Sequence, residues 1–161
     1  MLNSWLEDNF QKVVEIRRWL HQHPEVGFNE HETSMYCQDY MKHLGFTIHQ
    51  TEPMQTGFYC NYGNENGPTL AVRCDLDALP IQEVNSVDYC SVNPGVSHAC
   101  GHDAHLTNIL GLATYVIETE QMIQGTLRFL FQPAEEIAPG GAVVMIEGGA
   151  INGVDHIIGG H

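Results

Sequence analysis

Three short apolar segments, each followed within four residues by an acidic residue or histidine, most constrain the fold of this chain. They are residues 69–73, 126–131 and 155–158. Continuous apolar runs of this length are typical of strands buried in a parallel sheet. Segments with helical spacing of apolar residues lie around and between them: 4–22, 104–120 and 142–147. Strands that alternate with helices predict an α/β fold with a mixed, mostly parallel sheet flanked by helices.

Two further strands and a helix complete the prediction. Alternation of apolar and polar residues predicts strands over residues 46–50 and 57–62. A helix is expected after Asn29, whose side chain can cap it, with Glu32 as the partner in a capping box. Gly45 is placed to end that helix.

Composition excludes several classes of protein. The apolar fraction of 43% and charged fraction of 16% indicate a globular domain. A net charge of -14 argues against nucleic acid or an anionic membrane as a partner. No stretch approaches the roughly 20 apolar residues that cross a bilayer. Five cysteines without a CxxC pair, and an N-terminus that reads as an amphipathic helix rather than a secretory leader, predict reduced thiols and a cytoplasmic location.

The densest group of candidate metal ligands spans residues 97–105, Ser-His-Ala-Cys-Gly-His-Asp-Ala-His. It offers a thiolate, three imidazoles and a carboxylate, which are all ligands for transition metals. The glycine lets the backbone turn so that Cys100 and His102 reach one centre, and Asp103 can cap the next helix. His98 and His105 are better candidates for support than for ligation. A capped helix with surface or core histidines is the alternative interpretation.

Three other polar clusters follow predicted strands: Asp75 with Asp77, Glu135 with Glu136, and the final His161. Ligands in open α/β sheets collect beyond the carboxyl ends of the strands, so these clusters are expected at one edge. An aspartate there could ligate a metal or orient a ligating imidazole. Adjacent glutamates point different ways, so one would hold a metal while the other moves a proton. Solvated acidic loops are the alternative.

Other catalytic designs fit poorly. The chain has no GxSxG elbow, no P-loop and no dinucleotide-binding glycine motif. Cys100 could act as a nucleophile with His98 or His102 as its base. That design leaves the two adjacent glutamates without a role.

Five ordered segments resemble the co-catalytic metallopeptidase family of aminoacylases, dipeptidases and carboxypeptidases: 20–25, 73–80, 98–105, 132–136 and 140–161. The most similar branch is the amidohydrolases that cleave N-acyl amino acids, including hippurate hydrolases and indole-acetyl-amino-acid hydrolases. The resemblance implies a zinc-exopeptidase-like three-layer sandwich. It also implies two divalent metal ions per site, zinc or manganese, and a small-molecule N-acyl amino acid or peptide as substrate.

The resemblance also implies a role for each site residue. Cys100 would bridge the two metals, His102 and Glu136 would each ligate one of them, and His161 would be a further ligand. Glu135 would be the general base and acid that moves the proton of a metal-activated water. Asp77 would be a catalytic residue that orients a ligand. Asp75 stands where many relatives have a ligating histidine and where the amidohydrolase branch also has aspartate.

Relatives continue with a dimerisation or lid domain and then the rest of the catalytic domain, which supplies a further histidine ligand. The resemblance therefore implies that residues 1–161 are the N-terminal part of a catalytic metallohydrolase domain, with those later parts absent. Family members are often homodimers, but the dimerisation domain is missing here. The expected activity is metal-dependent hydrolysis of the amide bond of N-acyl amino acids or small peptides. The alternative is a truncated, catalytically inactive metal-binding remnant.

Overall fold

The computed structural model describes residues 2–52, 56–64 and 66–161, and it contains both helices and strands in alternation. In chain order the elements are α1 (Leu2–Gln22), α2 (His31–His43), β1 (His49–Gln50), β2 (Phe58–Gly63), β3 (Thr69–Asp75), α3 (His102–Glu118), β4 (Thr126–Gln132), α4 (Gly141–Glu147) and β5 (His156–Gly159). Every predicted element has a counterpart. The first predicted strand is the least accurate, because only its last two residues pair with β2.

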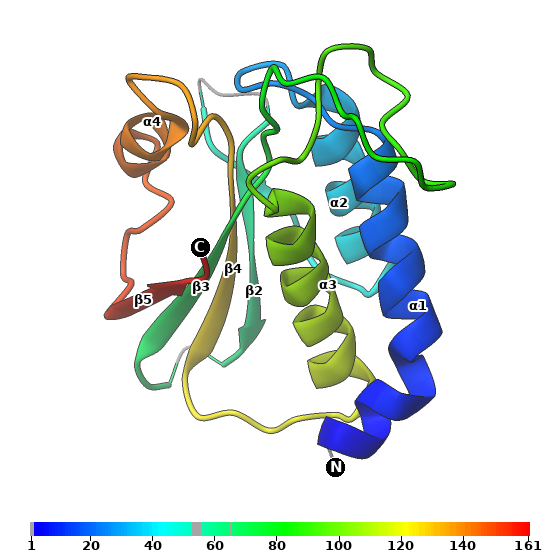
Figure 1. Cartoon of the computed structure of the whole chain (residues 1–161). Coiled ribbons are helices and arrows are strands. Elements are labelled where there is room, and N and C mark those ends of the chain that lie inside the picture. The colour runs from blue at the N-terminus through cyan, green and yellow to red at the C-terminus, as the bar shows by residue number, and fades with distance from the viewer. Residues whose placement is uncertain (1, 53–55, 65) are drawn as a thin grey trace.

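The strands form one five-stranded sheet in the order β1-β2-β4-β3-β5. Pairs β3–β4 and β3–β5 are parallel, whereas β1–β2 and β2–β4 are antiparallel. Four of these strands therefore run in one direction and β2 runs against them. Figure 1 shows α1, α2 and α3 on one face of the sheet and α4 on the other. The predicted mixed, mostly parallel sheet between helical layers is confirmed.

The larger part of the core lies between the sheet and helices α1 to α3. Its fully buried members include Leu20 of α1, Met41 of α2, Leu110 of α3, and Phe58 and Phe131, whose rings stack at 4.2 Å between centroids. Burying each such side chain contributes about 1.5–3 kcal/mol. This packing fixes α3 across the sheet, with its N-terminus beside the carboxyl ends of β3 and β4 (Figure 1).

The predicted cap of α2 is wrong. The helix begins at His31 with Glu30 as its N-cap, so Asn29 lies one residue too early, and its side chain bonds to the carbonyl of Gly27. The free backbone N–H groups of Glu32 and Thr33 instead donate to the carboxylate of Glu25, at 3.1 and 2.7 Å. The other end of α2 is as predicted: Gly45 follows the last turn and donates its N–H to the carbonyl of Lys42.

Strand β5 forms an exposed edge of the sheet, and all four of its residues are exposed. Ile157 and Ile158 point to opposite faces, as consecutive strand residues do, and they are 55% and 57% exposed. Apolar residues on both faces are typical of strands covered on both sides, so β5 has the composition of an interior strand in an edge position.

The helices are amphipathic or short. The longest, α1, buries Trp5, Ile16, Leu20 and His21 and turns most of its remaining residues to solvent. Within the part of the chain that the structure describes, no helix combines the length and the apolar character needed to cross a bilayer.

Candidate metal centre

The carboxyl ends of the parallel strands β3, β4 and β5 meet the N-terminus of α3, and the predicted site residues gather there. His102, in the first turn of α3, is at the centre and is almost fully buried. Its Nε2 lies 3.8 Å from one carboxylate oxygen each of Asp75, Glu135 and Glu136. Four chain segments thus bring their polar side chains to one point.

Donor atoms that could hold a cation lie within 4.8 Å of one another in three overlapping groups. They are Cys100, His102 and His161; His102, Glu135 and Glu136; and Asp75, His102 and His105. In the first group the Sγ of Cys100 is 3.4 Å from Nε2 of His161. The four predicted ligands all belong to these groups, and His102 is common to all three.

The orientation of His102 suits a metal ligand. Its Nδ1 lies 2.7 Å from the backbone carbonyl of Asp77, which can only accept a hydrogen bond, so Nδ1 carries the proton. In the neutral ring Nε2 then presents a lone pair to the cluster. This Nε2 is buried and has no hydrogen-bond partner among the described residues. A buried, unpaired nitrogen that faces carboxylates and a thiol fits a divalent metal ion.

Charges around His102 also act on its protonation. Burial alone lowers the pKa of His102, but the neighbouring carboxylates of Asp77 and Asp75 raise it, and the net shift is upward. A proton or a cation at Nε2 would each offset the negative charge of the surrounding carboxylates. Binding of a metal therefore competes with protonation of this ring.

Asp77 is fully buried and orders the loop that carries the two glutamates. Its two carboxylate oxygens accept hydrogen bonds from the backbone N–H groups of Glu135 and Glu136, each at 3.0 Å. Burial raises the pKa of Asp77, but hydrogen bonds from His102 and from these two N–H groups lower it by more. The net shift is downward, so the carboxyl stays ionised. Its backbone carbonyl and its side chain thus contact two different parts of the centre.

Asp75 lies among cationic and imidazole groups. Arg73 forms an ion pair with one of its oxygens, while the other lies 3.4 Å from Nδ1 of His105 and 4.0 Å from Nδ1 of His161. The guanidinium of Arg73 is also held by Gln132 on the neighbouring strand. Asp75 is therefore available both to ligate a cation and to fix the surrounding imidazoles.

The thiol of Cys100 is poorly suited to be a nucleophile in the metal-free protein. Although the residue is largely exposed, partial desolvation of the thiol and the nearby carboxylates of Glu136, Glu135 and Asp75 raise its pKa to about 11. Nucleophilic cysteines need a lowered pKa, because the thiolate is the reactive form. A divalent cation would reverse this effect, since a coordinating thiol is deprotonated.

Asp103 is not the N-cap residue of α3, although its Oδ1 accepts a hydrogen bond from the backbone N–H of Ala104 at 2.9 Å. Gly101, with φ of +96° in the left-handed region, precedes the helix and lets it begin at His102. Asp103 instead lies in the first turn, where one oxygen contacts Nε of Arg17 at 2.8 Å and Nδ1 of His21 at 2.7 Å. His21 in turn contacts Glu83 at 3.1 Å. This network ties the first turn of α3, which carries His102, to α1. In the sequence, only the resemblance of the segment 20–25 pointed to it.

His98 is buried beside this network. Burial lowers its pKa to about 4, so the ring is neutral, and neither nitrogen has a hydrogen-bond partner among the described residues. His98 is absent from the three groups of donor atoms, whereas His105 belongs to one of them.

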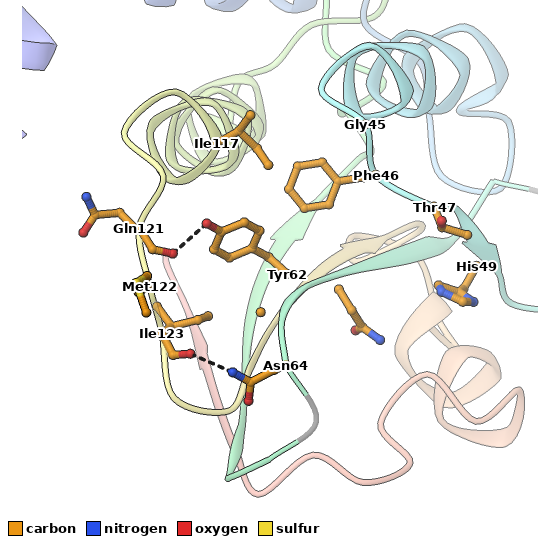
Figure 2. A pocket seen from close by; sticks show the side chains of 12 residues that line it. Gly45, Phe46, Thr47, His49, Tyr62, Asn64, Ile117, Gln121, Met122 and Ile123 are labelled. Atoms are coloured by element: carbon orange, nitrogen blue, oxygen red, sulfur yellow. Dashed lines mark hydrogen bonds between the residues drawn. The ribbon is translucent and has the colours of Figure 1, made fainter.

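A cleft of about 580 Å³ lies elsewhere, between the end of α3, the loop that follows it and β2. In Figure 2 the Tyr62 hydroxyl donates to the carbonyl of Gln121, and the Asn64 amide donates to that of Ile123. The 17 residues of α3 separate this cleft from the metal centre by about 25 Å, at about 1.5 Å per residue. Among the described residues that line it there is no carboxylate, so these residues do not repeat the donor set of the metal centre.

Known proteins resemble this chain in both sequence and fold. The sequence model of peptidase family M20/M25/M40 matches residues 71–161. An N-acyl-L-amino acid amidohydrolase of Geobacillus stearothermophilus is 43% identical over 150 residues, covering 92% of this chain and 40% of the relative. An N-acetyl-L-cysteine deacetylase of Bacillus subtilis is 41% identical over 152 residues, covering 94% and 36%.

A solved structure shows the same arrangement of elements. A dinuclear metal-binding peptidase of family M20 from Bacillus subtilis matches with a TM-score of 0.89 and 40% identity, over 95% of this chain and 43% of that one. The chain thus spans about 40% of the length of the curated relatives that it matches.

Proposed function

The chain belongs to peptidase family M20/M25/M40, and from this premise we propose that it is the N-terminal part of a metal-dependent amidohydrolase. The reaction is hydrolysis of the amide bond of N-acyl amino acids or small peptides. The observation that carries the proposal is the buried, unpaired Nε2 of His102, 3.8 Å from three carboxylates and grouped with a thiol and a second imidazole.

Two divalent ions, zinc or manganese, would be held by Cys100, His102, Glu136 and His161. Thiolate and imidazole ligands favour zinc, and carboxylates also suit manganese. When bound, the ions supply Lewis acidity, which polarises the scissile carbonyl and acidifies a water molecule.

Glu135 is the proton carrier in this proposal. Its carboxylate takes a proton from the attacking water and returns it to the nitrogen of the leaving amine. The side chain is 29% exposed, so it can face both the centre and a substrate. Asp77 holds the backbone of Glu135 and, through its own carbonyl, the Nδ1 proton of His102. Asp77 therefore acts by orientation and does not need to touch the substrate.

The substrate class rests on the relatives. Those named above are an amidohydrolase of N-acyl amino acids and a deacetylase of N-acetylcysteine, and both names describe cleavage of an acyl group from an amino acid. A small molecule with a scissile amide and a free carboxylate is the shared chemistry.

A second candidate function is that of a metal-binding remnant without turnover. These 161 residues bring the candidate ligands together, and they span about 40% of the length of the relatives. The side chain of His161, one of these candidate ligands, is 53% exposed.

Assays of the purified chain on N-acetyl and N-benzoyl amino acids, with added zinc or manganese, test both functions. Hydrolysis that a chelator abolishes supports the amidohydrolase, whereas metal binding without hydrolysis supports the remnant. Hydrolysis that resists chelation but is lost on alkylation would instead favour a cysteine nucleophile. Absence of metal binding would overturn both proposals.

A further inference from the structure

The loop that carries the two catalytic-centre glutamates is held by buried carboxylates on three consecutive backbone N–H groups. The N–H of Ala134 donates to Oε1 of Glu30 at 2.7 Å. Those of Glu135 and Glu136 donate to the two oxygens of Asp77. Asp77 was expected from the sequence, whereas Glu30, 104 positions before Ala134, was not.

Glu30 is fully buried, and no basic side chain in the described residues forms an ion pair with it. Its second oxygen accepts a hydrogen bond from the Thr56 hydroxyl at 3.1 Å. Burial raises its pKa, and the hydrogen bonds from backbone groups and Thr56 only partly offset this rise. A buried carboxylate without a neighbouring cation reduces the stability of the fold. Such residues are typical of functional sites, and the hydrogen bond from Ala134 to Glu30 indicates where the role of Glu30 lies.

The backbone that Glu30 holds is strained. Ala134 has φ of +48°, a left-handed conformation that is unfavourable for an alanine because it brings Cβ close to the following carbonyl oxygen. The chain just before Glu30 packs closely against this turn: a Cβ added to Gly27 would lie 3.1 Å from the Cα of Ala134. A strained turn persists only where its surroundings hold it, and the hydrogen bond from Ala134 to Glu30 is one such restraint.

We propose that Glu30 is a positioning residue of the metal centre. By holding the N–H of Ala134 it fixes the left-handed turn, which directs the Glu135 and Glu136 carboxylates toward Nε2 of His102. The inference rests on the proposed function, because the role is defined by the metal that these glutamates meet. The property of Glu30 that matters in this proposal is the length of its side chain, because the carboxylate must extend to the N–H of Ala134. The negative charge of Glu30 is secondary.

Three variants separate reach from charge. Glu30→Gln keeps the length and a carbonyl oxygen that can accept from Ala134, but it removes the charge. Glu30→Asp keeps the negative charge but shortens the side chain by one methylene group. Glu30→Ala removes both the charge and the length. Glu32→Ala is the matched control, because Glu32 is an exposed glutamate two positions away whose side chain is not in the centre.

The first measurement is zinc and cobalt binding to the 161-residue chain by calorimetry and by the cobalt absorption spectrum. Glu30→Asp and Glu30→Ala should bind about 10- to 100-fold more weakly, the usual loss when support of a ligand is removed. Glu30→Gln and Glu32→Ala should stay close to wild type. The d–d bands of bound cobalt should change in Glu30→Asp, since they report ligand geometry.

The second measurement is amide hydrogen exchange at Ala134 by NMR without metal. The amide should be protected in wild type and Glu30→Gln, and it should lose protection in Glu30→Asp. If Glu30→Ala does not fold, the Asp and Gln variants still decide the question. Equal metal affinity and equal Ala134 protection in Glu30→Asp and wild type would overturn the inference. So would a Gln variant that behaves like Asp, because charge would then be the essential property.

The two proposals fail in different ways. If the wild-type chain binds no metal, the proposed function fails, while exchange at Ala134 still reports whether Glu30 holds the turn. If the wild type binds metal and the Asp variant binds it equally well, only the inference about Glu30 fails.

Discussion

Glu135 and Glu136 are adjacent in sequence and equally distant from His102, yet the proposed mechanism gives them separate tasks. Glu135→Gln should lower turnover about 10²- to 10⁴-fold, because a glutamine cannot move the proton. Metal content should be retained, whereas Glu136→Gln should lose metal. Steady-state kinetics of the active enzyme measure the loss of turnover. Metal analysis of the purified variants measures the metal content. Glu147→Gln, an exposed position, is the control, and normal turnover in Glu135→Gln would show that the assigned role is wrong.

Glu83 makes the stability of the chain depend on pH. Burial would raise its pKa, but hydrogen bonds from Ser91, His21 and Asn85 lower it from 4.5 to about 2. The folded state therefore binds this proton more weakly than the unfolded state. The stabilisation is complete above pH 4.5 and is lost as the pH falls toward 2.

Glu83→Gln should cost about 1.5–3 kcal/mol of unfolding free energy at neutral pH, the range for hydrogen bonds to charged groups. The difference from wild type should shrink as the pH falls through that window. Urea unfolding at a series of pH values measures it. A difference that stays constant down to the acid end would contradict this origin.

At the scale of single residues, the sequence predicted the groups whose chemistry is visible in their identity. Cys100, His102 and the glutamate pair belong to this class, because thiol, imidazole and carboxylate are metal ligands wherever they occur. Glu30 and His21 could not be found this way. Their partners, Ala134 and Asp103, lie 104 and 82 positions away, and only the folded chain brings them together.

At the scale of elements, α2 offers a direct comparison between two candidate caps. The sequence favoured Asn29 with Glu32, whereas the structure uses the carboxylate of Glu25. Glu25→Ala should destabilise the chain by about 0.5–2 kcal/mol, because it leaves two helix N–H groups unpaired. Glu32→Ala should have little effect. Thermal or urea unfolding distinguishes them, and a larger loss in Glu32→Ala would restore the capping box.

The strands show where pattern is informative and where it is not. β3 and β4 were predicted almost to their ends, since buried parallel strands are continuous apolar runs. β1 was predicted three residues too long. Phe46 at its expected start is buried in the core against Phe129 without joining the sheet, and burial alone does not distinguish strand from loop. The sequence predicted a mostly parallel sheet, but the order of the strands and the antiparallel placement of β2 depend on contacts between distant segments, so they came from the structure.

At the scale of the whole molecule, metal binding should stabilise the fold, since the four proposed ligands come from three segments that only the folded chain assembles. At a free zinc concentration 100 times the Kd, the gain is about 2.7 kcal/mol, and a chelator should remove it. Thermal unfolding with and without zinc measures the shift. Cys100→Ala is the control: the side chain is exposed, so the variant should fold but show a smaller shift. An equal shift would place the metal elsewhere.

The exposed edge at β5 should make the chain associate with itself at high concentration. Ile158 and the unpaired backbone groups of β5 present a surface that another strand can join. Ile158→Lys should reduce the association measured by sedimentation velocity, because a charge on an edge strand opposes pairing. The exposed helix position Ile146→Lys is the control. Equal association in both variants would exclude the β5 edge as its cause.

Because the Cys100 side chain is exposed, its reactivity can be used to measure how many molecules hold a metal ion at the centre. Three of the five thiols, Cys37, Cys60 and Cys74, are buried, and Cys90 is half-buried. An alkylating reagent at alkaline pH would therefore tag Cys100 in empty molecules, while a bound cation would shield it. Intact-mass spectra would then count filled and empty molecules in one sample, with no substrate and no assumption about turnover.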